Sequence, residues 1–140
     1  MSGKFFLDTN VFVYSLELGE PAKASRAGEL IRDGLETRQG IVSYQVVQEF
    51  FNVAFNRFAR PMSPFAAEEY LSTVFRPLLG VHSSPALFLS ALQLHHQHHL
   101  CWYDSLIVAA AQEANCETLY SEDLQHGRRF DDLTITNPFH

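Results

Sequence analysis

The short apolar segment 5–7, which is followed at once by Asp8, most constrains how this chain can fold. Three consecutive apolar residues, Phe-Phe-Leu, are typical of a buried strand. A carboxylate directly after such a strand lies where α/β proteins bind their ligands, and a buried charge needs a partner there. Asp8 could instead simply cap the short helix predicted over residues 10–16. The local sequence leaves both roles open.

The rest of the chain alternates between short apolar segments and helical patterns. Further helices are predicted over residues 22–38, 44–58, 65–75 (ended by Pro77), 85–95 and 104–114. Further strands are predicted at residues 41–42, 78–81, 118–120 and 133–136, the last as an edge strand after a loop at 124–129. This alternation predicts an α/β fold with a mostly parallel central sheet and helices on both faces.

Length and composition fit one packed domain over residues 1–140. Hydrophobic residues make up 46% of the chain, so a disordered chain is not expected. No apolar run reaches the roughly 18 residues of a membrane span, and the N-terminus lacks the layout of a signal peptide. Cys101 and Cys116 are too few for a disulfide framework. We therefore expect a cytoplasmic protein that does not contact a membrane.

Three more acidic residues, Glu49, Asp104 and Asp123, lie just after an apolar segment or near the start of the next helix. In a parallel sheet such positions share one edge, so these carboxylates can converge with that of Asp8. Each has a simpler alternative. Asp104 could serve only to stabilise the first turn of its helix, and Glu49 could lie on a solvated helix face.

Two stripes run along the predicted helix 44–58, for which Ser43 is the expected cap. Glu49 belongs to a polar stripe that also contains Gln45, Asn52 and Asn56, and no Lys or Arg lies four residues away to pair with it. The apolar stripe includes four phenylalanines, Phe50, Phe51, Phe55 and Phe58. The chain has twelve phenylalanines, and with this cluster they exceed what one small core readily hides, which predicts that another chain covers part of this surface.

Four carboxylates at one point would repel, and each would have its pKa raised. A hard divalent cation removes this repulsion, and oxygen ligands favour Mg²⁺ or Mn²⁺ over Zn²⁺. Such ions bind phosphate and activate water in phosphodiester hydrolysis. The chain contains no P-loop, GxGxxG or GxSxG motif. The residues therefore indicate metal-assisted phosphoryl chemistry.

The net charge of −6 does not exclude an RNA partner. Without the four candidate carboxylates, the chain has 12 acidic and 10 basic residues, so its remaining charge is close to neutral. Eight of the basic residues are Arg, which contacts phosphate in a bidentate manner.

Four motifs in order resemble the PIN-domain family, specifically its VapC-type ribonuclease toxins. They are LDTNVFVY with Asp8, QEF with Glu49, WYDSLIVAAA with Asp104 and LYSEDLQHG with Asp123, and NPF at 137–139 fits as well. The resemblance covers essentially the whole chain. It implies a Mg²⁺- or Mn²⁺-dependent endoribonuclease that acts on single-stranded or loop RNA, forms a homodimer and is inhibited by a cognate antitoxin.

The resemblance also assigns roles to residues. It implies that Asp8, Glu49, Asp104 and Asp123 are the catalytic, metal-binding quartet and that two polar residues hold them in place, Asn10 and Ser121. Some relatives carry a further acidic residue past the fourth; here Glu122 and His126 stand nearby, so a second metal site stays open.

The sequence allows three other interpretations. A haloacid-dehalogenase-like phosphatase needs a second Asp two residues after the first, and position 10 is Asn. A non-catalytic PIN scaffold that binds RNA or protein would be favoured by loss of a quartet member, and none is lost. The HHQHH run at 95–99 has the spacing of a metal-binding helix, but a solvated helix end is the favoured interpretation.

Overall fold

The computed structural model describes residues 3–140, and within this range six strands form one sheet in the order β3-β2-β1-β4-β6-β5. The strands are β1 (Phe5–Leu7), β2 (Gly40–Ser43), β3 (Leu79–Val81), β4 (Thr118–Tyr120), β5 (Arg129–Phe130) and β6 (Leu133–Thr136). Only the β5–β6 pair is antiparallel in this sheet of the described residues. The predicted α/β fold with a mostly parallel sheet is confirmed.

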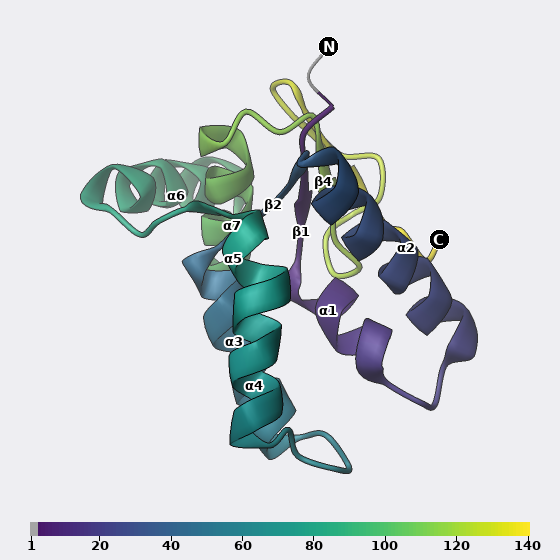
Figure 1. Ribbon diagram of the computed structural model, residues 1–140. Coiled ribbons are helices and arrows are strands. Elements are labelled where there is room, and N and C mark those ends of the chain that lie inside the picture. Colours follow the sequence, from purple (N-terminus) through teal and green to yellow (C-terminus); the bar gives the residue numbers. More distant parts are fainter. Residues whose placement is uncertain (1–2) are drawn as a thin grey trace.

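Helices cover both faces of the sheet (Figure 1). They are α1 (Thr9–Leu16), α2 (Pro21–Thr37), α3 (Tyr44–Asn56), α4 (Pro64–Tyr70), α5 (Arg76–Leu78), α6 (Pro85–His98) and α7 (Trp102–Glu113), with a π-helical turn η1 (Leu71–Phe75). The helix α2 lies on one side of β1, and α7 lies on the other. Between these layers the side chains of Phe6, Val42 and Leu119 are fully buried. No helix in residues 3–140 is both long enough and apolar enough to cross a membrane.

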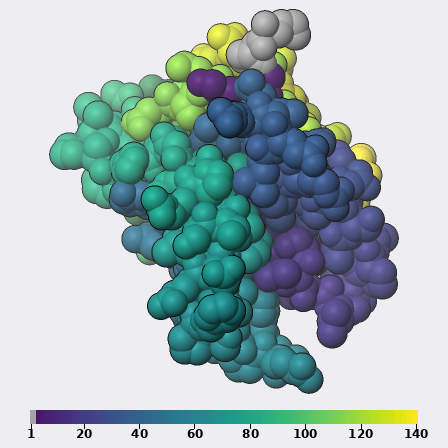
Figure 2. Space-filling model, viewed as in Figure 1, coloured from purple at the N-terminus to yellow at the C-terminus, as the bar shows by residue number. Residues whose placement is uncertain are grey.

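The predicted helix 65–75 is longer and less regular than expected. The elements α4, η1 and α5 form one continuous helical rod on the face of the molecule shown in Figures 1 and 2. The π turn ends at Phe75, whose ring is fully buried against Phe12 and Phe50. A π turn inserts one extra residue into the helix, and here it accompanies the burial of Phe75. The helix then runs past Pro77, the residue predicted to end it.

The prediction that residues 133–136 form an edge strand is wrong. The strand β6 lies inside the sheet, where it pairs in parallel with β4 and antiparallel with β5. The edge belongs to β5, which begins at the last residue of the segment predicted as a loop. The two strands are joined at Asp131, whose positive φ of 55° is a conformation that Asp tolerates in tight turns. A two-residue strand is too short to show a period in the sequence.

The fold itself buries part of the aromatic stripe that was predicted to be covered in part by another chain, and Phe55 remains 46% exposed. Phe50 is fully buried, and its ring stacks on Tyr70 with a centroid distance of 4.9 Å. Phe51 and Phe58 are half-buried, and both rings pack against Phe50. This aromatic cluster joins α3 to the rod of α4 and η1. The helix α6 also exposes apolar side chains, namely Phe88, Leu89 and Leu92.

Candidate active site

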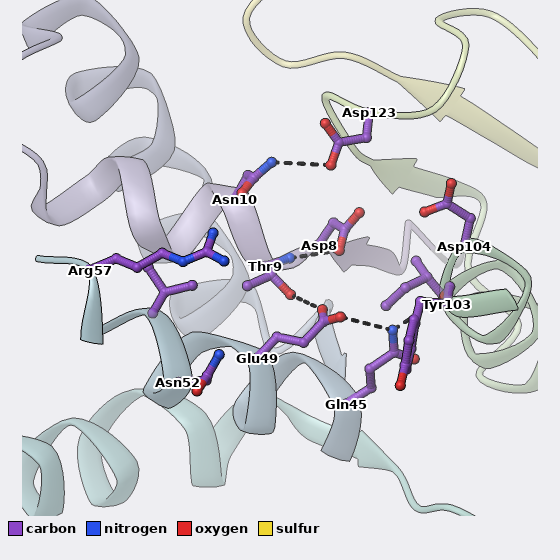
Figure 3. Close-up of a pocket in the computed structure, with 12 residues that line it drawn as sticks. Asp8, Thr9, Asn10, Gln45, Glu49, Asn52, Arg57, Tyr103, Asp104 and Asp123 are labelled. Carbon is purple, nitrogen blue, oxygen red and sulfur yellow. Dashed lines mark hydrogen bonds between the residues drawn. The ribbon is translucent and has the colours of Figure 1, made fainter. Parts of the chain in front are cut away.

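The four predicted carboxylates line one pocket of about 270 Å³ (Figure 3). It lies beyond the carboxyl ends of β1 and β4, where the chain changes direction across the sheet: β2 and β3 lie on one side of β1, and β4 to β6 lie on the other. Open α/β sheets bind ligands at such a point. The backbone N–H of Asp8 donates to the carbonyl of Tyr120 at 3.1 Å, which joins the two strand ends.

Asp8 caps a helix and also lines the pocket, so the two roles left open by the sequence coexist. One carboxylate oxygen, Oδ1, accepts from the N–H of Thr9 at 2.7 Å, and the other accepts from the Ser121 hydroxyl at 2.8 Å. Burial raises the pKa of Asp8 to about 6; these two hydrogen bonds lower it, while the negative charges of Glu49 and Asp123 raise it further. When no cation is bound, the pocket thus makes Asp8 easier to protonate than an Asp side chain in water.

Glu49 does not lie on a simple solvated face. Its Oε1 accepts from the Thr9 hydroxyl at 2.7 Å, and its Oε2 accepts from the side-chain amide of Gln45 at 3.3 Å. The same amide donates to the carbonyl of Tyr103 at 3.2 Å. Gln45 therefore joins α3 to the first turn of α7. Asn52 also lines the pocket, so three residues of the predicted polar stripe face it.

Asp104 and Asp123 complete the acidic lining. Asp104 lies in the first turn of α7, and no strand precedes it, because α6 ends at His98 and α7 begins at Trp102. A helix rather than a strand end brings Asp104 to the pocket. Asp123 accepts from the side-chain amide of Asn10 at 3.3 Å. Partial burial raises the pKa of Asp123, and the negative charges of Asp104 and Glu122 raise it further.

The oxygen donors of the pocket fit a hydrated divalent cation better than a fully protein-bound one. Among residues 3–140, no three His, Cys, Asp or Glu side chains lie close enough together to hold a metal ion by themselves. Mg²⁺, however, commonly keeps several waters and is held by only one or two carboxylates. Burial and neighbouring negative charges raise the pKa values of Asp8 and Asp123, and the positive charge of a cation would offset both effects.

The other candidate metal groups lie outside the pocket. Glu122 accepts from Lys23 and from the Tyr14 hydroxyl, each at 2.7 Å. His126 accepts from the backbone N–H of Asn137 at 3.0 Å, and neither Glu122 nor His126 lines the pocket. In the HHQHH run, His95 donates to the carbonyl of Leu100 at 2.6 Å.

Sequence reasoning missed Thr9 and Arg57. Arg57 follows α3 directly and lines the pocket, and within residues 3–140 its guanidinium has no ion-pair or hydrogen-bond partner. Figure 3 shows the guanidinium extended toward the pocket. The signal was its position eight residues after Glu49, which places both on one helix face. An unpaired Arg beside four carboxylates can bind the phosphate of a ligand.

Comparison with known proteins gives a family for this chain. A family model of the PIN domain matches residues 5–132. The chain belongs to the PIN-domain family. This membership excludes the haloacid-dehalogenase-like alternative. No curated protein sequence matches the chain.

Solved structures of PIN-domain size align with nearly the whole chain. FitAB bound to an IR36 DNA fragment aligns with a TM-score of 0.72 at 19% identity, over 97% of this chain and 96% of the other. A toxin–antitoxin complex from Klebsiella pneumoniae aligns with a TM-score of 0.66 at 17% identity, over 96% of this chain and 98% of the other. The sarcin-ricin loop cleaving toxin VapC20 of Mycobacterium tuberculosis aligns with a TM-score of 0.62 at 17% identity, over 86% of this chain and 90% of the toxin. At these identities the similarity shows a shared fold.

Proposed function

We propose that residues 1–140 form one nuclease domain, a metal-dependent endoribonuclease of the VapC type that hydrolyses phosphodiester bonds in single-stranded or loop RNA. The observation that carries this proposal is the lining of one pocket by Asp8, Glu49, Asp104 and Asp123 at the switch point of the sheet. The cleavage of RNA by the similar VapC20 toxin supports the choice of substrate class. The free thiols of Cys101 and Cys116 suit the reducing cytoplasm, where we place the protein.

The residues of the pocket have distinct roles in this proposal. Asp8, Glu49, Asp104 and Asp123 would hold a hydrated Mg²⁺ or Mn²⁺, one or two of them directly and the others through its bound waters. The ion would supply phosphate binding and water activation. Ser121 and Asn10 are positioning residues, since they donate to Asp8 and Asp123 at 2.8 and 3.3 Å.

Three further residues complete the proposed pocket. Thr9 and Gln45 position Glu49 from two sides through its two carboxylate oxygens. Arg57 contacts a phosphate of the RNA backbone from the end of α3.

Chelation tests the proposal. Purified protein is incubated with single-stranded RNA in Mg²⁺ or Mn²⁺, in excess EDTA, and in EDTA followed by excess Mg²⁺. We expect cleavage with either metal, its loss in EDTA and its recovery when Mg²⁺ is restored. Cleavage that persists in excess EDTA contradicts the metal-dependent mechanism. RNA binding without cleavage under any metal condition would favour the non-catalytic scaffold.

We further propose an antitoxin partner, which the similarity to a toxin–antitoxin complex supports. A groove of about 730 Å³ lies between the α1–α2 connection and the end of α3, lined by Leu18, Phe58 and Arg60 among others. Leu18 is 96% exposed, so an apolar antitoxin segment would cover it. Arg57 lines both this groove and the acidic pocket, so a segment bound in the groove reaches the active site.

We also propose that the protein is a homodimer. The helix α6 projects from one side of the molecule (Figures 1 and 2), and Leu89 and Leu92 are exposed on it. Light scattering at tens of micromolar should give twice the monomer mass. Adding the protein encoded beside this one should increase that mass, and Leu18→Glu should prevent the increase while leaving the dimer intact. A monomer whose mass does not change on mixing contradicts both proposals.

A further inference from the structure

A second pocket of about 320 Å³ lies directly beside the acidic one. The two pockets share Gln45 and Tyr103, and the second is also lined by Ser43, Phe88 and Trp102. Its volume is at the small end of the range for ligand sites, about 300–1000 Å³. It carries none of the four carboxylates of the acidic pocket. The two neighbouring pockets therefore offer different chemistry to the same ligand.

Three of the nine residues that line the second pocket are aromatic, namely Phe88, Trp102 and Tyr103. The rings of Phe88 and Trp102 lie 6.5 Å apart with an interplanar angle of 37°. Tyr103 is 63% exposed and lies on the side of the acidic pocket away from Arg57 (Figure 3). Exposed aromatic rings beside a phosphate-binding site are the usual platforms on which unpaired bases stack.

The second pocket also has polar groups that are free to bind. Ser43 was predicted to cap α3, and it occupies the cap position, but its hydroxyl makes no cap hydrogen bond. The residue is only 3% exposed, and among residues 3–140 the hydroxyl has no hydrogen-bond partner. A buried hydroxyl without a partner costs stability and calls for an explanation. Gln48 adds an exposed amide to the same pocket.

We propose that this second pocket binds one unpaired nucleobase of the RNA strand whose phosphate lies in the acidic pocket. The base stacks on the rings of Tyr103, Trp102 and Phe88, and its polar edge bonds to Ser43 and Gln48. The proposal rests on the proposed ribonuclease function for its ligand class. It assigns to this pocket the recognition of a base next to the cleaved bond.

The position of Trp102 gives a direct assay, because it is the only tryptophan in the chain. Single-stranded oligoribonucleotides of each of the four bases are titrated into the whole protein in Ca²⁺, with strand integrity checked on a gel. A strand of equal length without bases carries the same phosphates. We expect the base-bearing strands to change the Trp102 emission saturably and the abasic strand not to. Equal changes with both kinds of strand overturn the proposal.

Variants locate the effect. Tyr103→Ala and Phe88→Ala should each weaken binding of base-bearing strands by between about fivefold and about a hundredfold, with binding of the abasic strand unchanged. The Tyr103 variant keeps the Gln45 hydrogen bond, since that bond uses the backbone carbonyl. Phe65→Ala is the matched control, because Phe65 is 73% exposed and lines neither pocket.

Two results would exclude the base pocket. One is that both pocket variants bind base-bearing strands as tightly as the Phe65 control does. The other is that Trp102 emission depends on protein concentration and not on RNA, because a second copy of the chain would then cover the pocket. The test is separate from that of the proposed function. A protein that never cleaves RNA can still show base-dependent quenching, and a protein that cleaves RNA can lack it.

Discussion

Asp8→Asn is expected to lower kcat/KM for metal-dependent RNA cleavage by at least about a hundredfold. Asn has nearly the same shape as Asp and is an equally good helix cap. The variant should therefore keep the bond from the N–H of Thr9 that starts α1. What it loses is one of the four negative charges that line the acidic pocket. Initial rates on one single-stranded RNA in Mg²⁺ measure the effect.

Two further variants show whether the loss is specific. Asp33→Asn removes an exposed carboxylate from α2, far from the pocket in sequence and absent from its lining, and it should leave the rate unchanged. Arg57→Gln should mainly raise KM, because it removes a phosphate contact made in the ground state. An Asp8→Asn protein that retains most of the wild-type rate would remove Asp8 from the catalytic site.

Asp8→Asn should also stabilise the folded protein when metal is absent. The pKa of Asp8 is raised from 3.8 to about 6 in the folded state, so the folded chain binds more protons than the unfolded chain between these values. The free energy of unfolding of metal-free protein should therefore fall as pH rises from about 4 to about 6 and then level off. One unit of pKa shift corresponds to about 1.4 kcal/mol, so Asp8 alone accounts for a loss of about 3 kcal/mol. Asp123 shifts in the same direction.

Denaturant unfolding in EDTA from pH 4 to pH 8 measures this dependence. Asp8→Asn should remove most of the fall, so at pH 7.5 the variant should be more stable than wild type by about 2–3 kcal/mol. A carboxylate that acts only as a helix cap predicts the opposite sign, because loss of its charge near a helix N-terminus costs stability. A variant that is less stable than wild type at pH 7.5 in EDTA contradicts the raised pKa of Asp8, whose largest cause is burial.

The sequence predicted those parts of the fold that are periodic or that end in a distinctive residue. The apolar segment 5–7 predicted the central strand β1, and Asp8 directly after it predicted a carboxylate at the ligand-binding edge of the sheet. The strand β5 and the π turn before Arg76 were missed, since each is set by tertiary packing over a few residues. The sequence alone does not show which phenylalanine of α3 is buried, because the burial of Phe50 depends on how α3 packs against the α4–η1 rod.

The sequence predicted the four carboxylates of the candidate site, but not all of the residues that contact them or lie beside them. The sequence predicts Asp104 near the start of a helix. The residue lines the acidic pocket although no strand leads into that helix. The Thr9 hydroxyl and Arg57 reach the pocket from α1 and the end of α3. The spacing from Glu49 along one helix face indicates Arg57. The contribution of Thr9 depends on how α1 meets α3 in space, and spacing along one helix does not reveal that.

Stabilisation by Mg²⁺ tests most directly the central claim that the four carboxylates form one cation site. Melting temperatures at pH 7.5 are measured for wild type, Asp8→Asn, Asp104→Asn and the control Asp33→Asn, in EDTA and over a range of Mg²⁺ concentrations. A ligand that binds only the folded state stabilises it by mass action. The wild type and the control should therefore gain stability with Mg²⁺, and the two pocket variants should gain much less. Equal gains in all four proteins, or none in the wild type, would contradict a metal site in this pocket.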